Sequence, residues 1–196
     1  MSKKKLLSGL FAISCIMVSQ AFAGDMQALK GTYRGVVHVN CLESVDGFTA
    51  PPDLRFVQRP GNFAARYADV YVSTAVFNGD GTMTESVAGT TIFGGEAYDG
   101  ALAAGTFVDT CHYTLASIGN GTFSLKGNCA GHIPTGPAAG LTITVTDIDA
   151  QMQLSDDHRM ILLGGPEPDS NTLALNTGYT APRLCAPMGT YMRVNP

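Results

Sequence analysis

Short runs in which apolar and polar residues alternate follow one another along most of this chain. Glycines and prolines, 23 and 10 of them, separate these runs, and long stretches with helical periodicity are missing from the sequence. In the 140–154 run, the apolar positions change from odd to even numbers near Thr146-Asp147, which predicts a β-bulge. The pattern predicts eight strands, over residues 32–43, 66–77, 82–93, 104–117, 122–129, 140–154, 159–164 and 188–195.

Three tight turns are predicted between these strands. The motif FNGDGT at residues 77–82 resembles a calcium loop, but Met83 stands where an EF-hand loop needs a glycine. It fits a three-residue hairpin loop instead. The motifs IGNGT at 118–122 and SDDHR at 155–159 fit the same loop type, the latter with His158 in the left-handed position.

The second turn sets the pairing of its two strands, and side-chain polarity tests that pairing. Pairing about Asn120 gives one face that is almost wholly apolar and sets Cys111 opposite Cys129. The register therefore predicts a Cys111–Cys129 disulfide, which leaves Cys41 to bond Cys185. The same reasoning applied to the other hairpins and strands predicts a set of apolar residues that point inward: Val37, Leu115, Phe123, Leu125, Met152 and Leu162.

The order of short and long connections predicts the architecture. In an up-and-down meander, every tight turn falls at one end and every long loop at the other. A Cys41–Cys185 bond would then join the first strand to the last, which is how a barrel closes. The predicted fold is thus all-β, an up-and-down antiparallel barrel of about eight strands, and the alternative is a two-sheet β-sandwich.

The first 23 residues have the features of a secretory signal peptide: three lysines, a short apolar run, and a small-x-small pattern that ends at Ala23. Residues 24–196 then form a single domain in the bacterial periplasm or outside the cell, where an even number of cysteines forms disulfides. The apolar run is too short to predict an integral membrane span. A lipoprotein anchored through Cys15 is disfavoured, because the preceding residues make a poor lipobox.

Charge and motifs exclude several classes of function. After residue 23, nine Lys and Arg side chains remain against 16 Asp and Glu, which argues against nucleic acid or an anionic membrane as partner. The chain has no G-x-S-x-G, H-E-x-x-H, P-loop or dinucleotide motif. The sequence therefore predicts no catalytic residues, no metal ligands and no cofactor.

The opening GTYRGVV, the FNGDGT turn and the cysteine-bearing hairpin after it together show a likeness to known barrels. The chain resembles small secreted bacterial lipocalin-like (calycin-type) proteins, and its layout is similar to barrels of the allene oxide cyclase type. The resemblance implies a barrel fold, and no functional residue is carried over from it.

Loops at one end of a rigid barrel are the natural place for a binding site. As a general base, His132 would need an orienting carboxylate, which the sequence does not supply. The exposed pair Asp147 and Asp149 is interpreted as solvated. The long loops are predicted to bring a group of polar side chains to one rim: Asp53, Arg55, Arg59, Tyr98, His132 and Glu167.

Three functions compete. The first is binding of a small apolar or amphipathic ligand inside the barrel, which a fully packed interior would contradict. The second is a protein-interaction module, such as a protease inhibitor that uses the 44–64 loop. The third is a small barrel isomerase or cyclase, which would need a titratable pair inside the barrel, and the sequence shows no candidate for such a pair.

Overall fold

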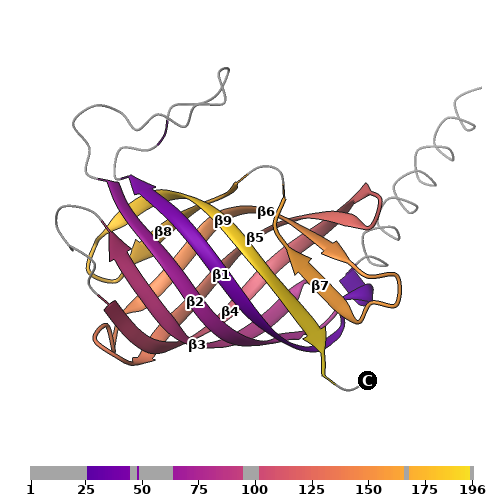
Figure 1. Cartoon of the computed structure of the whole chain (residues 1–196), viewed down its shortest axis with the longest axis horizontal. Coiled ribbons are helices and arrows are strands. Elements are labelled where there is room, and N and C mark those ends of the chain that lie inside the picture. Colours follow the sequence, from indigo (N-terminus) through magenta and orange to yellow (C-terminus); the bar gives the residue numbers. More distant parts are fainter. Residues whose placement is uncertain (1–25, 45–47, 49–63, 95–101, 166–167, 195–196) are drawn as a thin grey trace, which may run out of the picture.

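The computed structural model describes residues 26–44, 48, 64–94, 102–165 and 168–194, and almost all of these residues lie in antiparallel strands (Figure 1). The alternation of apolar and polar residues produces these strands, because side chains of a strand point alternately to its two faces. In the first strand, Tyr33, Val37 and Cys41 are buried, and Arg34 and His38 are exposed. The strands are β1 Gly31–Ser44, β2 Ala64–Phe77, β3 Thr82–Gly94, β4 Leu102–Gly119, β5 Thr122–Thr135, β6 Thr142–Leu154, β7 Met160–Leu163, β8 Asp169–Leu175 and β9 Thr180–Arg193.

The strands close into a barrel. Each strand pairs with the next along the chain from β1 to β7, and β9 pairs with β1. The short strands β7 and β8 both lie between β6 and β9, and they pair with different parts of those two strands. The predicted all-β barrel is therefore confirmed, with one of its eight positions shared by two strands, and the sandwich alternative is wrong.

One part of the strand prediction is wrong. Residues 165–187 were expected to form a long loop, but they contain β8 and the first half of β9. Prolines and glycines interrupt this region, and its apolar runs are short. The pairing with β6 and with the end of β1 is what holds these residues in strands, and a local pattern does not contain that information.

The predicted disulfides are both present. Cys111 lies opposite Cys129 in the β4–β5 pair, and Cys41 lies opposite Cys185 in the β1–β9 pair. Their Cα–Cα distances are 4.0 and 4.1 Å, respectively. The second bond joins the two strands that close the barrel. Two disulfides fit a location outside the reducing cytoplasm.

The β4–β5 hairpin has the predicted pairing but a different turn. Asn120 and Gly121 both have positive φ, 53° and 70°, so they form the two-residue turn that hairpins favour. A register shift between Ser117 and Gly119 then restores the predicted pairing.

The β6–β7 hairpin corrects the predicted register. His158 takes the left-handed conformation as expected, with φ of 55°. However, the amide of Ser155 donates to the Met160 carbonyl at 3.0 Å, and this loop is one residue longer than predicted. Ile161 therefore points inward at 1% exposure, and Leu162 is 36% exposed instead of buried.

The predicted bulge in β6 is confirmed at Asp147, which has φ of 55°.

The half of the barrel nearer the tight turns is filled by apolar side chains. Tyr33, Phe77 and Tyr113 pack edge to face there, with ring centroids 5.6 and 5.7 Å apart. A single helical turn at residues 26–28 precedes β1 and covers this end, where Leu29 is fully buried (Figure 1).

Nothing in the described part of the chain is a helix long and apolar enough to cross a membrane.

Candidate functional site

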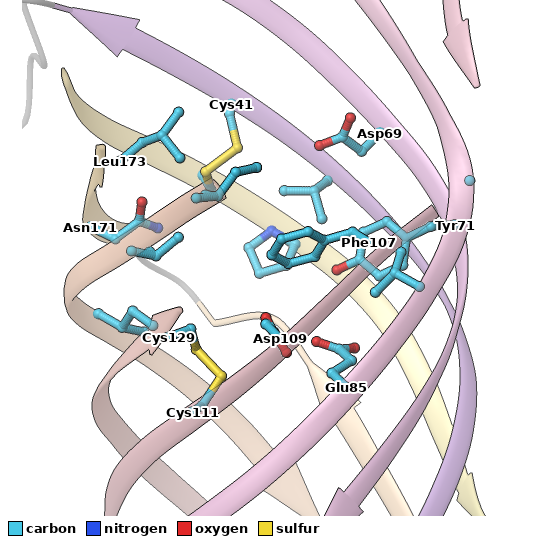
Figure 2. Close-up of a pocket in the computed structure, with 18 of the residues that line it drawn as sticks. Cys41, Asp69, Tyr71, Glu85, Phe107, Asp109, Cys111, Cys129, Asn171 and Leu173 are labelled. Atoms are coloured by element: carbon cyan, nitrogen blue, oxygen red, sulfur yellow. A yellow bond between two sulfur atoms is a disulfide. The ribbon is translucent and has the colours of Figure 1, made fainter. Parts of the chain in front are cut away.

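The other half of the barrel encloses a cavity of about 1080 Å³. It extends from the apolar core to the connection between β5 and β6, where Pro137 and Ala138 line it. Both disulfides form part of its wall (Figure 2). The volume is slightly above the usual range for small-molecule sites, roughly 300–1000 Å³. The interior is therefore not packed to core density. A fully packed interior would have contradicted ligand binding inside the barrel.

A pair of carboxylates lies on the wall of this cavity. Glu85 of β3 and Asp109 of β4 occupy opposing positions in the strand pair, so their side chains point to the same side of the sheet (Figure 2). Glu85 Oε1 accepts hydrogen bonds from the hydroxyls of Ser73 and Tyr191, the latter at 2.7 Å. Asp109 is only 7% exposed, and its Oδ1 has no hydrogen-bond partner among the described residues.

This environment shifts the protonation of Asp109. Burial, and then the negative charge of Glu85, raise the pKa of Asp109 to about 7, against the opposing effect of the Glu85 backbone amide. Burial also raises the pKa of Tyr71, on the neighbouring part of the wall. Asp109 is thus a buried acid that exchanges its proton near neutral pH, which is a feature common at functional sites.

The absence of a side chain at Gly131 provides the space that the Asp109 side chain occupies. Gly131 of β5 lies opposite Asp109, and a Cβ placed on it would be 2.4 Å from the Val108 carbonyl oxygen, 2.6 Å from Asp109 Cβ and 2.7 Å from the ring of Phe107. Any larger residue would therefore displace the β4 backbone as well as these two side chains. Gly131 is therefore part of the geometry of the carboxylate pair.

A second polar group, nearer the long-loop end, is organised by Arg183 of β9. Arg183 Nη1 donates to the Tyr67 hydroxyl and Nε donates to Asn171 Oδ1, each at 2.7 Å. Glu43 lies opposite Arg183 in the strand pair and accepts a hydrogen bond from Tyr179. Burial raises the pKa of Tyr67 to about 12, against the effect of the Arg183 charge, so Tyr67 remains a neutral hydroxyl. β8 and β9 supply Asn171 and Arg183, in the region that was predicted to be a loop.

The described cavity wall is rich in acids. Burial raises the pKa of Asp69, and it raises that of Asp169 to about 6, where Asp149 adds to the effect and the Gln151 amide opposes it. Against the carboxylates, Arg183 is the one Lys or Arg among the described lining residues. The acidic lining residues are Glu43, Asp69, Glu85, Asp109 and Asp169.

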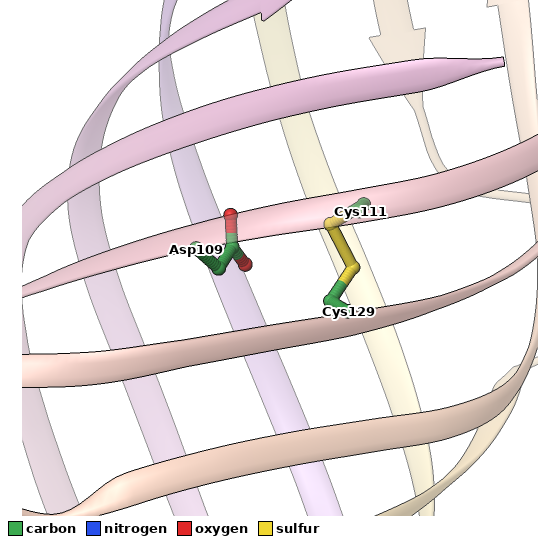
Figure 3. Close-up of side chains that lie close together, drawn as sticks. All are labelled: Asp109, Cys111 and Cys129. Atoms are coloured by element: carbon green, nitrogen blue, oxygen red, sulfur yellow. A yellow bond between two sulfur atoms is a disulfide. The ribbon is translucent and has the colours of Figure 1, made fainter.

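One cluster has the composition of a metal site but not its chemistry. The ligand atoms of Asp109, Cys111 and Cys129 lie within 4.8 Å of one another (Figure 3). The two sulfurs are bonded to each other, and a metal needs thiolates. These three residues therefore form no metal site while the disulfide is intact.

The residues predicted at the rim fall in different places. Asp53, Arg55, Arg59, Tyr98 and Glu167 lie outside the described residues. His132 does not lie in a loop, because β5 continues to Thr135, and its exposed side chain is on the outer face of the barrel. Its neighbour Ile133 lines the cavity, and strand alternation turns His132 away from it.

The carboxylate pair was missed, although the sequence contains a signal for each member. In the first hairpin, Glu85 lies opposite the apolar Ala75, which is unusual for a residue on an inward face. Asp109 has the same strand parity as Cys111 and Tyr113, which the predicted register placed inward. An acid at an inward position is expensive and is therefore a candidate for function.

Comparison of the chain with family models, with curated proteins and with solved structures finds no match.

Proposed function

We propose that this protein binds a small, mainly apolar or amphipathic molecule inside the barrel. The cavity of about 1080 Å³ is the observation that carries the proposal. Its wall combines apolar side chains with a few convergent polar groups, the composition typical of ligand sites. The apolar core and the helical turn close one end, so a ligand enters from the end that carries the long connections.

The proposed setting is the bacterial periplasm or the exterior of the cell. The signal peptide predicted at residues 1–23 supports export, and the two disulfides are consistent with an oxidising compartment. In such a setting, a closed barrel protects an apolar molecule from water while it is stored or carried.

Filling the cavity tests the proposal. Ala150 of β6 lines the cavity, so Ala150→Trp should occupy part of the volume and weaken binding of the neutral fluorescent reporter N-phenyl-1-naphthylamine at least tenfold. Ala130 of β5 is exposed on the outer face, and Ala130→Trp is the matched control that should bind the reporter normally. Native mass spectrometry of the exported protein should also show a co-purified ligand, which Ala150→Trp loses. Equal reporter binding by both variants would contradict the proposal.

A barrel enzyme is the second candidate, because Glu85 and Asp109 form the titratable pair that an isomerase or cyclase would need. The same mass spectrometry distinguishes the two. A carrier returns its extracted ligand unchanged, whereas an enzyme converts it in a reaction that Asp109→Asn abolishes.

A protease inhibitor remains a prediction that depends on the 44–64 loop, most of which lies outside the described residues.

A further inference from the structure

Asp109 has an unfilled hydrogen-bonding position inside the cavity. Its side chain is buried, and Oδ1 accepts no hydrogen bond from the described part of the chain, although buried carboxylate oxygens are normally paired. Leaving such an acceptor without a donor destabilises the folded protein, because the oxygen has lost its hydrogen bonds to water. A ligand that brings a donor to Oδ1 would recover this free energy.

The carboxylate of Glu85 adds negative electrostatic potential around Asp109. It lies beside Asp109 across the β3–β4 pair (Figure 2). Its own Oε1 accepts hydrogen bonds from the hydroxyls of Ser73 and Tyr191. These two hydroxyls fix the Glu85 carboxylate against the wall. Two neighbouring carboxylates repel each other, and a positive charge placed between them relieves that repulsion.

Among the described lining residues, none other supplies that positive charge to the pair. Arg183 donates to Tyr67 and Asn171, and Glu43 occupies the position opposite it. In the described lining, five carboxylates stand against this one guanidinium. The field inside the barrel therefore favours a cation over an anion.

We propose that the ligand carries a cationic nitrogen, such as a protonated amine, which Asp109 and Glu85 bind while the apolar wall covers the rest of the molecule. This inference rests on the proposed binding function. An ammonium group has three N–H donors, enough to reach Asp109 Oδ1 and the neighbouring Glu85 carboxylate together. Tyr71 and Phe107 line the same part of the cavity and offer rings to the groups next to the nitrogen (Figure 2).

Three probes with one chain and different headgroups test the inference: decylamine, decanol and decanoate. Each probe competes at pH 8 with N-phenyl-1-naphthylamine for binding to the disulfide-bonded protein. Each probe is used below the concentration at which the probe itself aggregates. Decylamine should displace the reporter at a concentration roughly tenfold lower than decanol, since hydrogen bonds to charged groups contribute about 1.5–3 kcal/mol. Decanoate should be the weakest of the three.

Two variants assign the preference to the carboxylate pair. Asp109→Asn should lower the amine-to-alcohol ratio severalfold, because the ammonium group then has the Glu85 carboxylate alone. Asp169→Asn removes a different acid of the same cavity, one that accepts a hydrogen bond from the Gln151 amide, and should keep the ratio.

The outcomes separate the two proposals. If the reporter binds but decanol matches decylamine, decanoate is strongest, or Asp109→Asn keeps the ratio, the amine inference is overturned and the binding function stands. If the reporter and all three probes fail to bind the wild-type protein, the binding function itself is overturned.

Discussion

At the scale of single residues, the most unusual feature is an acid that is kept in a buried position with no compensating cation in the described part of the chain. In most cores, a position such as that of Asp109 holds an apolar residue, because an unpaired buried charge is expensive. The protein lowers the cost by holding Asp109 protonated up to a pH of about 7. Such a cost is commonly found where a side chain serves binding or catalysis.

This cost predicts how stability depends on pH. The folded-state pKa of Asp109 is raised from 3.8 to about 7, so the folded protein binds the proton more tightly than the unfolded chain. The free energy of unfolding should therefore fall as pH rises from about 4 to about 7 and level off above that. The size is at most roughly 4 kcal/mol, from about 1.4 kcal/mol per pKa unit.

Asp109→Asn should remove most of this slope and make the protein more stable than wild type at pH 8, by roughly 1–3 kcal/mol. Urea unfolding between pH 4 and 8 measures it. Asp169, whose pKa is raised to about 6, contributes in the same direction, so a smaller slope remains in the variant. A wild-type curve that rises from pH 4 to pH 7 would contradict the assignment.

At the scale of elements, turns decide which residues of a strand face the interior. In the β4–β5 hairpin, the turn and the sheet agree with the pairing about Asn120. In the β6–β7 hairpin, one extra residue in the turn exchanges the faces of the whole short strand β7. Ile161 and Leu162 are therefore a direct measure of the register.

Alanine substitution in β7 should give two very different results. Ile161→Ala removes a side chain of the core and should cost about 2–5 kcal/mol of the free energy of unfolding. Leu162→Ala removes a half-exposed side chain and should change that free energy by about 1 kcal/mol or less. Urea unfolding of both variants measures the difference. The reverse order of costs would support the three-residue loop predicted from the sequence, in which Leu162 points inward.

At the scale of the whole molecule, closure distinguishes this barrel from an open meander. The seam between β1 and β9 joins the two ends of the chain and removes two open strand edges. The Cys41–Cys185 bond spans this seam over 144 residues, whereas Cys111–Cys129 spans a local hairpin over 18 residues. The two bonds therefore restrict the unfolded chain to very different degrees.

Removing the disulfides one at a time should show this difference. The chain-entropy relation gives a loss of roughly 5 kcal/mol for the Cys41→Ala, Cys185→Ala double variant and roughly 3 kcal/mol for Cys111→Ala, Cys129→Ala. Urea unfolding under non-reducing conditions measures both. Equal losses, or a larger loss for the hairpin bond, would indicate that the seam is held mainly by its strand pairing.

The sequence by itself determined the strand class, most strand limits, the bulge near Asp147 and both disulfides. These features follow from local alternation and turn chemistry, which act over a few residues and are therefore visible in the chain. Even barrel closure followed from the predicted disulfides, because pairing Cys111 with Cys129 leaves Cys41 to bond Cys185.

Only the tertiary structure decided what the barrel contains. β8 and the first half of β9 are strands because β6 and β1 pair with them, and their own sequence does not specify it. Whether the interior is filled or hollow depends on how side chains from all the strands meet, and alternation predicts only which way each one points. The Glu85–Asp109 pair arises in the same way, because two acids on separate strands become a site only once those strands pair and bury them together.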